Sequence, residues 1–226
     1  MPYRTSSLQT ASTGGATSLA VNVPVGHVAG DIIIVGVSSG GNGSTPQTIS
    51  LTGGPWNTLA SDGTTKGTCT IFWKVDSGSE PSTYTASWTT SDATVIQAVA
   101  FSGLSATQAN TPSVAAVNGG SATITASSVT CALNDDLILF FPTHNAGSSP
   151  AVTTPPSGPW SQIAYTTSGG STGMALYYQN SVSAGASSPA ASLTWNNSTL
   201  WYGATLWNMS AVSVTPSYPI SSDNYF

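Results

Sequence analysis

The chain of 226 residues repeats itself once, at an offset of about 105 residues. Five short segments recur in the same order with only small changes in spacing, which chance does not explain. An internal repeat constrains the fold strongly, because each copy must form the same kind of supersecondary unit. The paired segments are GDIIIVGV (30–37) and DDLILFFP (135–142), GPW (54–56) and GPW (158–160), TIFWKV (70–75) and ALYYQN (175–180), ASWTT (86–90) and SLTWNN (192–197), and QAVAFSG (97–103) and GATLWNM (203–209).

Both copies have the pattern of β-structure. Short stretches rich in Val, Ile, Thr, Tyr and Trp alternate with clusters of Gly, Ser, Asn and Pro. Ser and Thr make up about a third of the chain and, with Gly, disfavour helix. The expected strands lie near 18–23, 31–37, 48–52, 57–61, 68–75, 83–88 and 94–101, and near 121–131, 136–142, 151–153, 161–166, 173–179, 191–195 and 199–208.

Six to eight short strands in each copy predict a sandwich or a jelly roll. The sequence therefore predicts an all-β chain of two tandem β-sandwich or jelly-roll-like repeats. The first repeat covers residues 1–110 with a short N-terminal arm, the second covers 111–211, and 212–226 form a C-terminal arm. The connecting stretch 105–120 is expected to be a loop or an edge strand.

Two of the expected strands are apolar on both faces. They are ATVIQAVAF (93–101) and its counterpart TLWYGATLW (199–207). A strand of this kind is normally buried on both sides. One face serves its own sandwich, so the other meets the sister repeat, another subunit or a ligand. Packing between the repeats is the first expectation and an interface with another subunit the second.

The charge of the chain excludes several classes of protein. Lys and Arg number three, Asp and Glu eight, and charged residues make up only 5%. Binding to nucleic acid or to an anionic membrane needs clustered basic residues, so neither is expected. No apolar run has the length of a membrane span, and no secretory signal is expected at the N-terminus. Cys69 and Cys131 lie in strand-like contexts and are expected to be buried, unreactive thiols.

Residues that could carry catalysis do not form a recognisable set. Asp31 and Asp136 begin the same strand in the two copies, which indicates a structural role. His27 and His144 do not correspond between the copies, and no nucleophile motif accompanies them. Spacings typical of zinc or nucleotide sites are missing as well. Carbonyls with Asp135 and Asp136 could bind calcium, but a lone Asp pair is weak evidence for such a site. The sequence predicts no enzyme, no cofactor and no metal.

The remaining chemistry lies in seven Trp and eight Tyr residues. Pairs at equivalent positions are expected in the core or packed over a sandwich edge: Trp73 with Tyr178, Trp88 with Trp195, and Trp56 with Trp160. Aromatic residues less constrained by the repeat, together with the C-terminal residue, are candidates for an interface: Trp201, Trp207, Tyr218, Tyr225 and Phe226.

The order GDIIIVGVSSGG, GPWNTLAS, TIFWKVDSGSEPSTYTASW and AVAFSG resembles a β-sandwich repeat common in bacteriophage structural proteins. In that family a GD before an apolar strand, a P-x-G-W-like turn, a Y-x-K-V…SEPS-x-Y-x-F-x-W stretch and an A-x-x-Y-x-G strand recur in tandem. The resemblance covers most of residues 15–104 and, more faintly, 120–209. In the second copy SEPSTYT becomes SSPAASLT and Gln179 replaces the equivalent of Lys74, so roles of these positions do not carry over.

The resemblance implies a non-enzymatic virion protein, either a capsid decoration (cement) protein or a tail-associated accessory. Its implied partners are major capsid or tail subunits and further copies of itself, and its implied location is the virion, assembled in the host cytoplasm. A chain with few charges can pack many copies with little electrostatic repulsion. The alternative is a lectin-like module of a fibre or tail that recognises a surface glycan through its exposed aromatic residues.

Overall fold

The computed structural model describes residues 8–40, 46–64, 67–105, 113–118, 122–130, 137–145, 150–168, 171–180, 190–196 and 201–209. Of these, residues 62–64, 113–118, 180 and 201–209 are described by their backbone alone. Within these ranges the chain forms β-strands and no helix, and every strand pairing is antiparallel. The predicted all-β fold is confirmed.

The strands are β1 (Gln9–Asn22), β2 (Ile32–Gly40), β3 (Ser50–Leu51), β4 (Asn57–Thr64), β5 (Gly67–Val75), β6 (Thr83–Phe101), β7 (Ser113–Asn118), β8 (Thr123–Ala126), β9 (Leu137–Asn145), β10 (Val152–Thr154), β11 (Ser161–Ser168), β12 (Thr172–Asn180), β13 (Ala191–Trp195) and β14 (Trp201–Met209).

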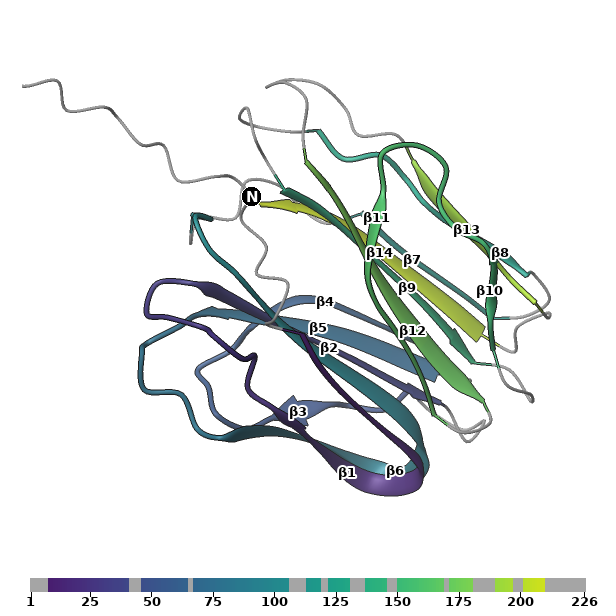
Figure 1. Cartoon of the computed structure of the whole chain (residues 1–226). Coiled ribbons are helices and arrows are strands. Elements are labelled where there is room, and N and C mark those ends of the chain that lie inside the picture. Colours follow the sequence, from purple (N-terminus) through teal and green to yellow (C-terminus); the bar gives the residue numbers. More distant parts are fainter. Residues whose placement is uncertain are drawn as a thin grey trace, which may run out of the picture.

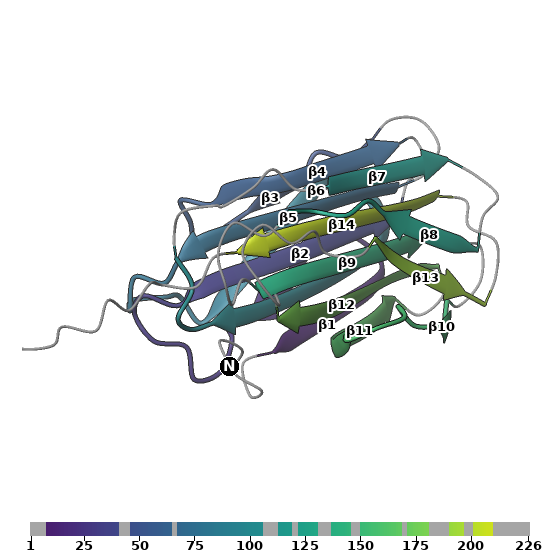
Figure 2. The same ribbon diagram turned by 90° about the horizontal axis from the view of Figure 1, so that it is seen from above.

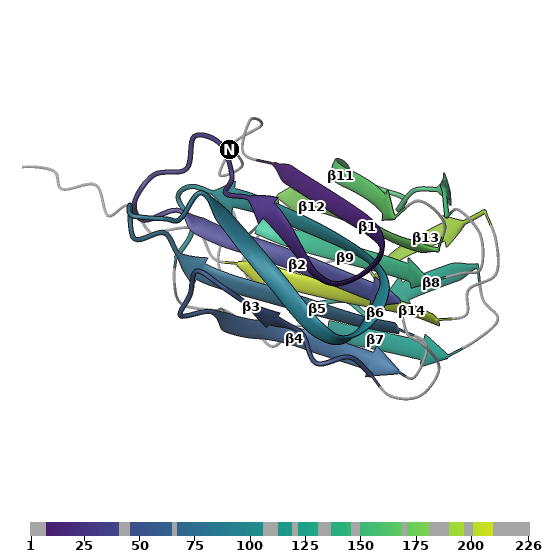
Figure 3. The same cartoon turned by 90° about the horizontal axis from the view of Figure 1, so that it is seen from below.

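The first half of the chain forms one sheet that bends back on itself. Its strand order is β1-β6-β2-β5-β4, with β3 paired to β6. The 9–13 part of β1 pairs with the 94–98 part of β6, and the 18–22 part pairs with 83–87 after two register shifts. Register shifts of this kind bend a strand, and Figure 3 shows β1 and β6 curving across β2. The bend encloses a core of Val21, Val23, Ile33, Val35, Val37, Ile49, Phe72, Tyr84, Ala86, Trp88, Ile96, Ala98 and Ala100.

The second half forms two separate sheets instead. A five-stranded sheet has the order β11-β12-β9-β14-β7, and a three-stranded sheet has the order β10-β13-β8. Figure 2 shows the smaller sheet lying over one end of the larger one. The core between them contains Ile124, Ala126, Val129, Ile138, Phe140, Ala175, Tyr177, Ala191, Leu193 and Trp195.

A third core joins the two halves. Alternate residues of β2 and β9 point toward each other across it, and Figure 1 shows the sheet that contains β2 facing the sheet that contains β9. Side chains in strands point alternately to opposite faces, so both central sheets are buried on both sides. The residues of this core are Ile32, Ile34, Leu59, Ala60, Cys69, Ile71, Trp73, Val99, Phe101, Leu104, Leu137, Leu139, Phe141, Ala164 and Leu176.

Hydrogen bonds reinforce the contact between the halves. Gln97 is 1% exposed, and its amide donates to Thr166 Oγ1 and to the carbonyl of Met174, both at 3.0 Å. The hydroxyl of Thr172 donates to the carbonyl of Ala93 at 3.1 Å. Of the alternatives open for the strand over 93–101, packing between the repeats is the one observed.

Several boundaries differ from those expected. The expected strands 83–88 and 94–101 are one strand, β6, and β1 begins at Gln9 rather than near residue 18. Residues 113–118 form the edge strand β7, which decides between the two expectations for that stretch. The strand order of the larger sheet in the second half matches that of the first sheet, with β7, β14, β9, β12 and β11 replacing β1, β6, β2, β5 and β4. The jelly-roll-like repeat and the domain boundaries stay predictions.

Candidate functional site

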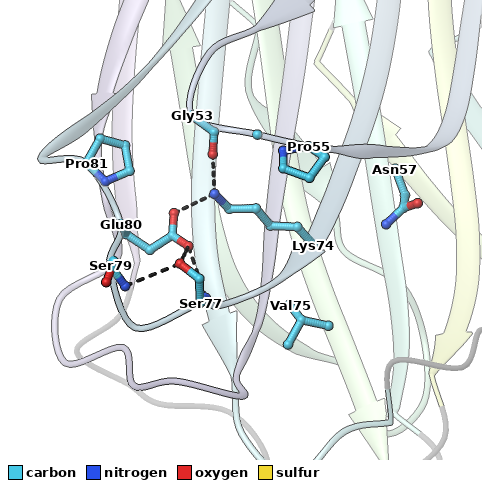
Figure 4. Close-up of a pocket in the computed structure, with 10 residues that line it drawn as sticks. Gly53, Pro55, Asn57, Lys74, Val75, Ser77, Ser79, Glu80 and Pro81 are labelled. Atoms are coloured by element: carbon cyan, nitrogen blue, oxygen red, sulfur yellow. Dashed lines mark hydrogen bonds and ion pairs between the residues drawn. The ribbon is translucent and has the colours of Figure 1, made fainter.

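A hollow with charged walls lies at the end of β5 in the first half. Its volume is about 700 Å³. It is lined by Gly53, Gly54, Pro55, Asn57, Lys74, Val75, Ser77, Ser79, Glu80 and Pro81. Figure 4 shows the Lys74 side chain reaching from β5 toward the loop before β4 and toward the loop before β6.

A buried ion pair forms the floor of this pocket. Lys74 Nζ lies 2.5 Å from Glu80 Oε2, and the exposed fractions of the two side chains are 9% and 2%. The same ammonium donates to the carbonyl of Gly53. The second carboxylate oxygen, Oε1, accepts from the backbone N–H and the hydroxyl of Ser77, both at 3.3 Å. The pair therefore connects β5 to two loops at once.

Two aromatic rings complete the surroundings of Lys74. Its Nζ lies 4.5 Å from the ring centroid of Trp56 and 4.9 Å from that of Tyr84, within cation–π distance. The Tyr84 hydroxyl donates to Glu80 Oε2 at 2.8 Å, and the Trp56 indole donates to the carbonyl of Thr52 at 2.9 Å. We call Trp56, Lys74, Glu80 and Tyr84 the lysine network.

Backbone geometry helps to bring the loop over the lysine. Gly53 has φ +78°, a left-handed conformation that favours glycine. A Cβ atom at this position would lie 2.8 Å from the Tyr84 ring. The glycine thus lets the carbonyl that Lys74 binds approach the aromatic rings closely.

The lysine network shifts the titration of its acids. Burial opposes ionisation of Glu80, but hydrogen bonds from Lys74, Tyr84 and Ser77 and the positive charge of Lys74 outweigh it, so the pKa of Glu80 is lowered. Burial, followed by the hydrogen bond to the Glu80 carboxylate, raises the pKa of Tyr84. Both shifts favour one state, with Glu80 ionised and Tyr84 protonated.

A second polar cluster lies directly beside the pocket. His27 Nδ1 is 2.6 Å from Asp76 Oδ2, and the Asp76 side chain is fully buried. The other oxygen of Asp76 accepts from the N–H of Gly78 at 2.7 Å. Asp31 is 3% exposed and accepts from the N–H of Val28 at 3.1 Å, a turn contact of the kind that a structural role requires. Asp136 lies outside the described residues.

Taken together, these contacts fasten loops. The charged groups of the lysine network are each engaged by one another or by backbone groups, so the network ties β5 to the loops before β4 and β6. Among the described residues, no group of three or more His, Cys, Asp or Glu side chains could hold a metal ion. In the same part of the chain, no helix is long and apolar enough to cross a bilayer.

A smaller hollow of about 460 Å³ lies between the 46–49 segment and β4 and β5, lined by Pro46, Gln47, Thr48, Ile49, Thr58, Ser61, Thr68 and Thr70. Gln47 fixes its wall, because its amide donates to the carbonyl of Thr90 and accepts from the Thr89 hydroxyl. Ser61 and Thr70 hydroxyls lie 3.2 Å apart. The hollow offers hydroxyl and amide groups without a charge.

The candidates from the sequence fall on other parts of the molecule. Trp201 and Trp207 lie on β14, between β9 and β7, where the structure describes the backbone alone. Tyr218, Tyr225 and Phe226 lie outside the described residues. The structure therefore places none of these five interface candidates at either of the two hollows described above.

The structure places the aromatic pairs that the sequence analysis expected in the core or over a sandwich edge. Trp73, Trp88 and Trp195 are buried as expected, and Tyr178 packs against the core between the halves. Trp56 and Trp160 pack over the cores of their own halves, as predicted. Cys69 is buried, whereas Cys131 lies outside the described residues.

The sequence reasoning did not identify the lysine network as a site. One signal was available, because Lys74 interrupts the apolar strand TIFWKV and a buried lysine is almost never without a partner. Comparisons with protein-family models, with curated proteins and with solved structures found no match to this chain.

Proposed function

We propose that this chain is a non-enzymatic structural component of a bacteriophage virion, a capsid decoration (cement) protein or a tail-associated accessory that acts by protein–protein packing. Its partners are major capsid or tail subunits and further copies of itself. The two halves are tandem copies of one sandwich-like repeat. The chain assembles in the host cytoplasm and remains with the virion.

The observation that carries this proposal is that the buried charged residues of the first half bind one another and fix loops. Lys74, Glu80 and Tyr84 belong to the stretch TIFWKVDSGSEPSTYTASW, on which the resemblance to phage structural repeats rests. In the fold they bind one another and the carbonyl of Gly53. Residues that fix loops in this way favour a rigid building block over an active site.

The arrangement of the sheets also supports the proposal. Two central sheets pack face to face through apolar residues from both halves, which makes the unit thick and stiff. With only 5% charged residues, the surface offers little electrostatic repulsion between closely packed copies.

The test is to purify particles of a phage that encodes this chain and to measure their protein content by peptide mass spectrometry. We expect the chain to band with the particles in many copies and to be visible as ordered density on the head or tail. Particles made without it should be intact but less resistant to heat if it is a cement protein. A chain that is abundant in the lysate and absent from gradient-purified particles would overturn the proposal.

The lectin-like alternative has a separate readout. Strong, selective hits on a glycan array that are abolished by Trp201→Ala would replace packing by glycan recognition as the function. Binding that is weak or unaffected by this substitution would leave the packing function in place.

A further inference from the structure

The central strands of the two facing sheets, β2 and β9, run in the same direction. Their first residues, Ile32 and Leu137, belong to one core between the halves. Their last residues meet as well, because a Cβ atom at Gly40 would lie 3.3 Å from the side-chain nitrogen of Asn145. β5 pairs antiparallel with β2, and β14 pairs antiparallel with β9. β5 and β14 therefore both end where β2 and β9 begin, at one end of the molecule (Figure 2).

The chain leaves β14 beside the 700 Å³ pocket. β5 ends at Val75, which is 43% exposed and lines that pocket. β14 ends at Met209 and lies against β5 across the core between the halves, and facing sheets are about 10 Å apart. Residues 210–226 follow Met209 and lie outside the described residues. The stretch from 210 to 218 can span about 30 Å, so the residues that follow it can reach the pocket.

The pocket favours a segment without charge. Lys74 and Glu80 neutralise each other at its floor, so a charged group gains little there. Part of its wall is apolar and consists of the exposed side chains of Val75, Pro55 and Pro81. The uncharged polar side chains that line it are Asn57, Ser77 and Ser79. A hollow of this kind takes up an apolar side chain and orients it through a few polar groups.

One segment of the C-terminal stretch has the matching chemistry. Residues 215–220, TPSYPI, carry no charged side chain. Their two prolines favour an extended backbone, which loses little conformational entropy when it binds in a groove. Tyr218 combines an apolar ring with a hydroxyl that can bond to a polar wall. Extended proline-containing segments are a recurring class of groove ligand.

We propose that residues 215–220 dock in the pocket of their own chain, with the Tyr218 ring against Pro55 and Pro81. The segment crosses from the end of β14 past Val75 and covers the buried pair of Lys74 and Glu80 from water. This contact lies within one chain, so its failure would leave the virion proposal as it stands.

Hydrogen–deuterium exchange on the purified chain tests the contact. Tyr218→Ala should speed amide exchange in 53–57 and 77–81 by roughly tenfold, because these loops lose their cover. Tyr225→Ala makes the same change outside the docking segment and should leave the exchange of both loops unchanged. Thermal melts of each variant establish that it is folded. Unchanged exchange in Tyr218→Ala, or equal effects of the two substitutions, overturns the inference.

Disulfide trapping identifies which chain supplies the segment. Ser217→Cys combined with Ser79→Cys, in a chain that also carries Cys131→Ser, should form a disulfide within one chain in oxidised glutathione. The control pairs Ser217→Cys with Thr154→Cys, an exposed position on β10, which Figure 2 shows away from the ends of β5 and β14. It should give no link. A disulfide-linked dimer, or no link between 217 and 79, overturns docking within one chain.

Discussion

The two halves of the molecule share an aromatic framework and differ in charge. Trp56 and Trp160 each follow a Gly-Pro pair in the sequence, and each packs over the core of its own half. The halves diverge at the second strand after these tryptophans, where Lys74 in β5 aligns with Gln179 in β12. Both side chains are buried, at 7% and 4% exposure.

Their surroundings are not alike. Lys74 is bound by Glu80, by the Gly53 carbonyl and by two aromatic rings, whereas Gln179 Oε1 has no hydrogen-bond partner among the described residues. Likewise the Trp56 indole has a carbonyl partner, and the Trp160 indole has none in the described part of the chain. Among the described residues, the first half thus has charged contacts around its tryptophan that the second half does not show, and the lysine network fixes the loops of the first half.

The largest expected effect comes from the same substitution made in both halves. Lys74→Met should lower the free energy of unfolding by about 3 kcal/mol, because it leaves the Glu80 carboxylate buried without its counter-ion. Gln179→Met should change it by no more than about 1 kcal/mol, since an amide with an unpartnered oxygen is removed. Urea denaturation of both variants measures the difference. Equal losses of unfolding free energy in the two variants would show that Lys74 is no more important to stability than Gln179.

The pH dependence of stability tests the same difference between wild type and Lys74→Met. Because the pKa of Glu80 is lowered in the folded state, its contribution to stability is present above the ordinary pKa of a glutamate and is lost as the pH falls through the lowered value. In Lys74→Met, only the hydrogen bonds from Tyr84 and Ser77 still oppose the effect of burial, so the pKa of Glu80 should rise. The variant should then gain stability as the pH falls from the raised value toward the ordinary one. The difference in the free energy of unfolding between the wild type and Lys74→Met should therefore become smaller in acid. Replacing both partners, in Lys74→Met with Glu80→Leu, should recover much of the loss at neutral pH.

A smaller effect is expected at the contact between the halves. Gln97→Leu removes two hydrogen bonds that cross from β6 to β11 and β12, and it should cost about 1–2 kcal/mol. Because the apolar core there draws on both halves, unfolding should stay a single transition seen together by tryptophan fluorescence and far-UV circular dichroism. Two separate transitions in the wild type would mean that the two halves unfold independently. They would then have to be compared as separate domains.

Much of this framework could be predicted from sequence. The repeat located the equivalent aromatic residues, and the two-sided apolar pattern of 93–101 correctly indicated burial of both faces. The break expected between 88 and 94 was wrong, because TTSDAT contains neither Gly nor Pro, and Ser and Asp alone do not end a strand. The strand continues through it and bends opposite the register shifts of β1.

The lysine network and the Gln97 contact could not be derived in the same way. Glu80 reaches Lys74 only because the chain turns between β5 and β6, and a pattern of apolar residues does not specify which acid meets which base. The Gln97 contact depends on the register between two sheets that are joined by packing rather than by strand pairing. Periodicity fixes which face of a strand is buried, but it does not fix what lies across from that face.

The smallest effect is expected at Asp92, where β6 bends opposite the register shifts of β1. Its carboxylate lies against Gly40, its Oδ1 accepts from the N–H of Ala93 at 2.7 Å, and its Oδ2 has no partner among the described residues. Burial raises the pKa of Asp92, so the folded state takes up its proton more readily than the unfolded chain. The charge thus destabilises the fold above the raised pKa, and this cost disappears as the pH falls toward the ordinary value of an aspartate. Asp92→Asn keeps the acceptor for Ala93 without the charge, and should raise the free energy of unfolding at neutral pH by up to about 1 kcal/mol. Asp92→Ala, the matched control, also removes the acceptor and should show no such gain in stability. A loss of stability in Asp92→Asn would mean that the carboxylate is bound more strongly than its contacts indicate.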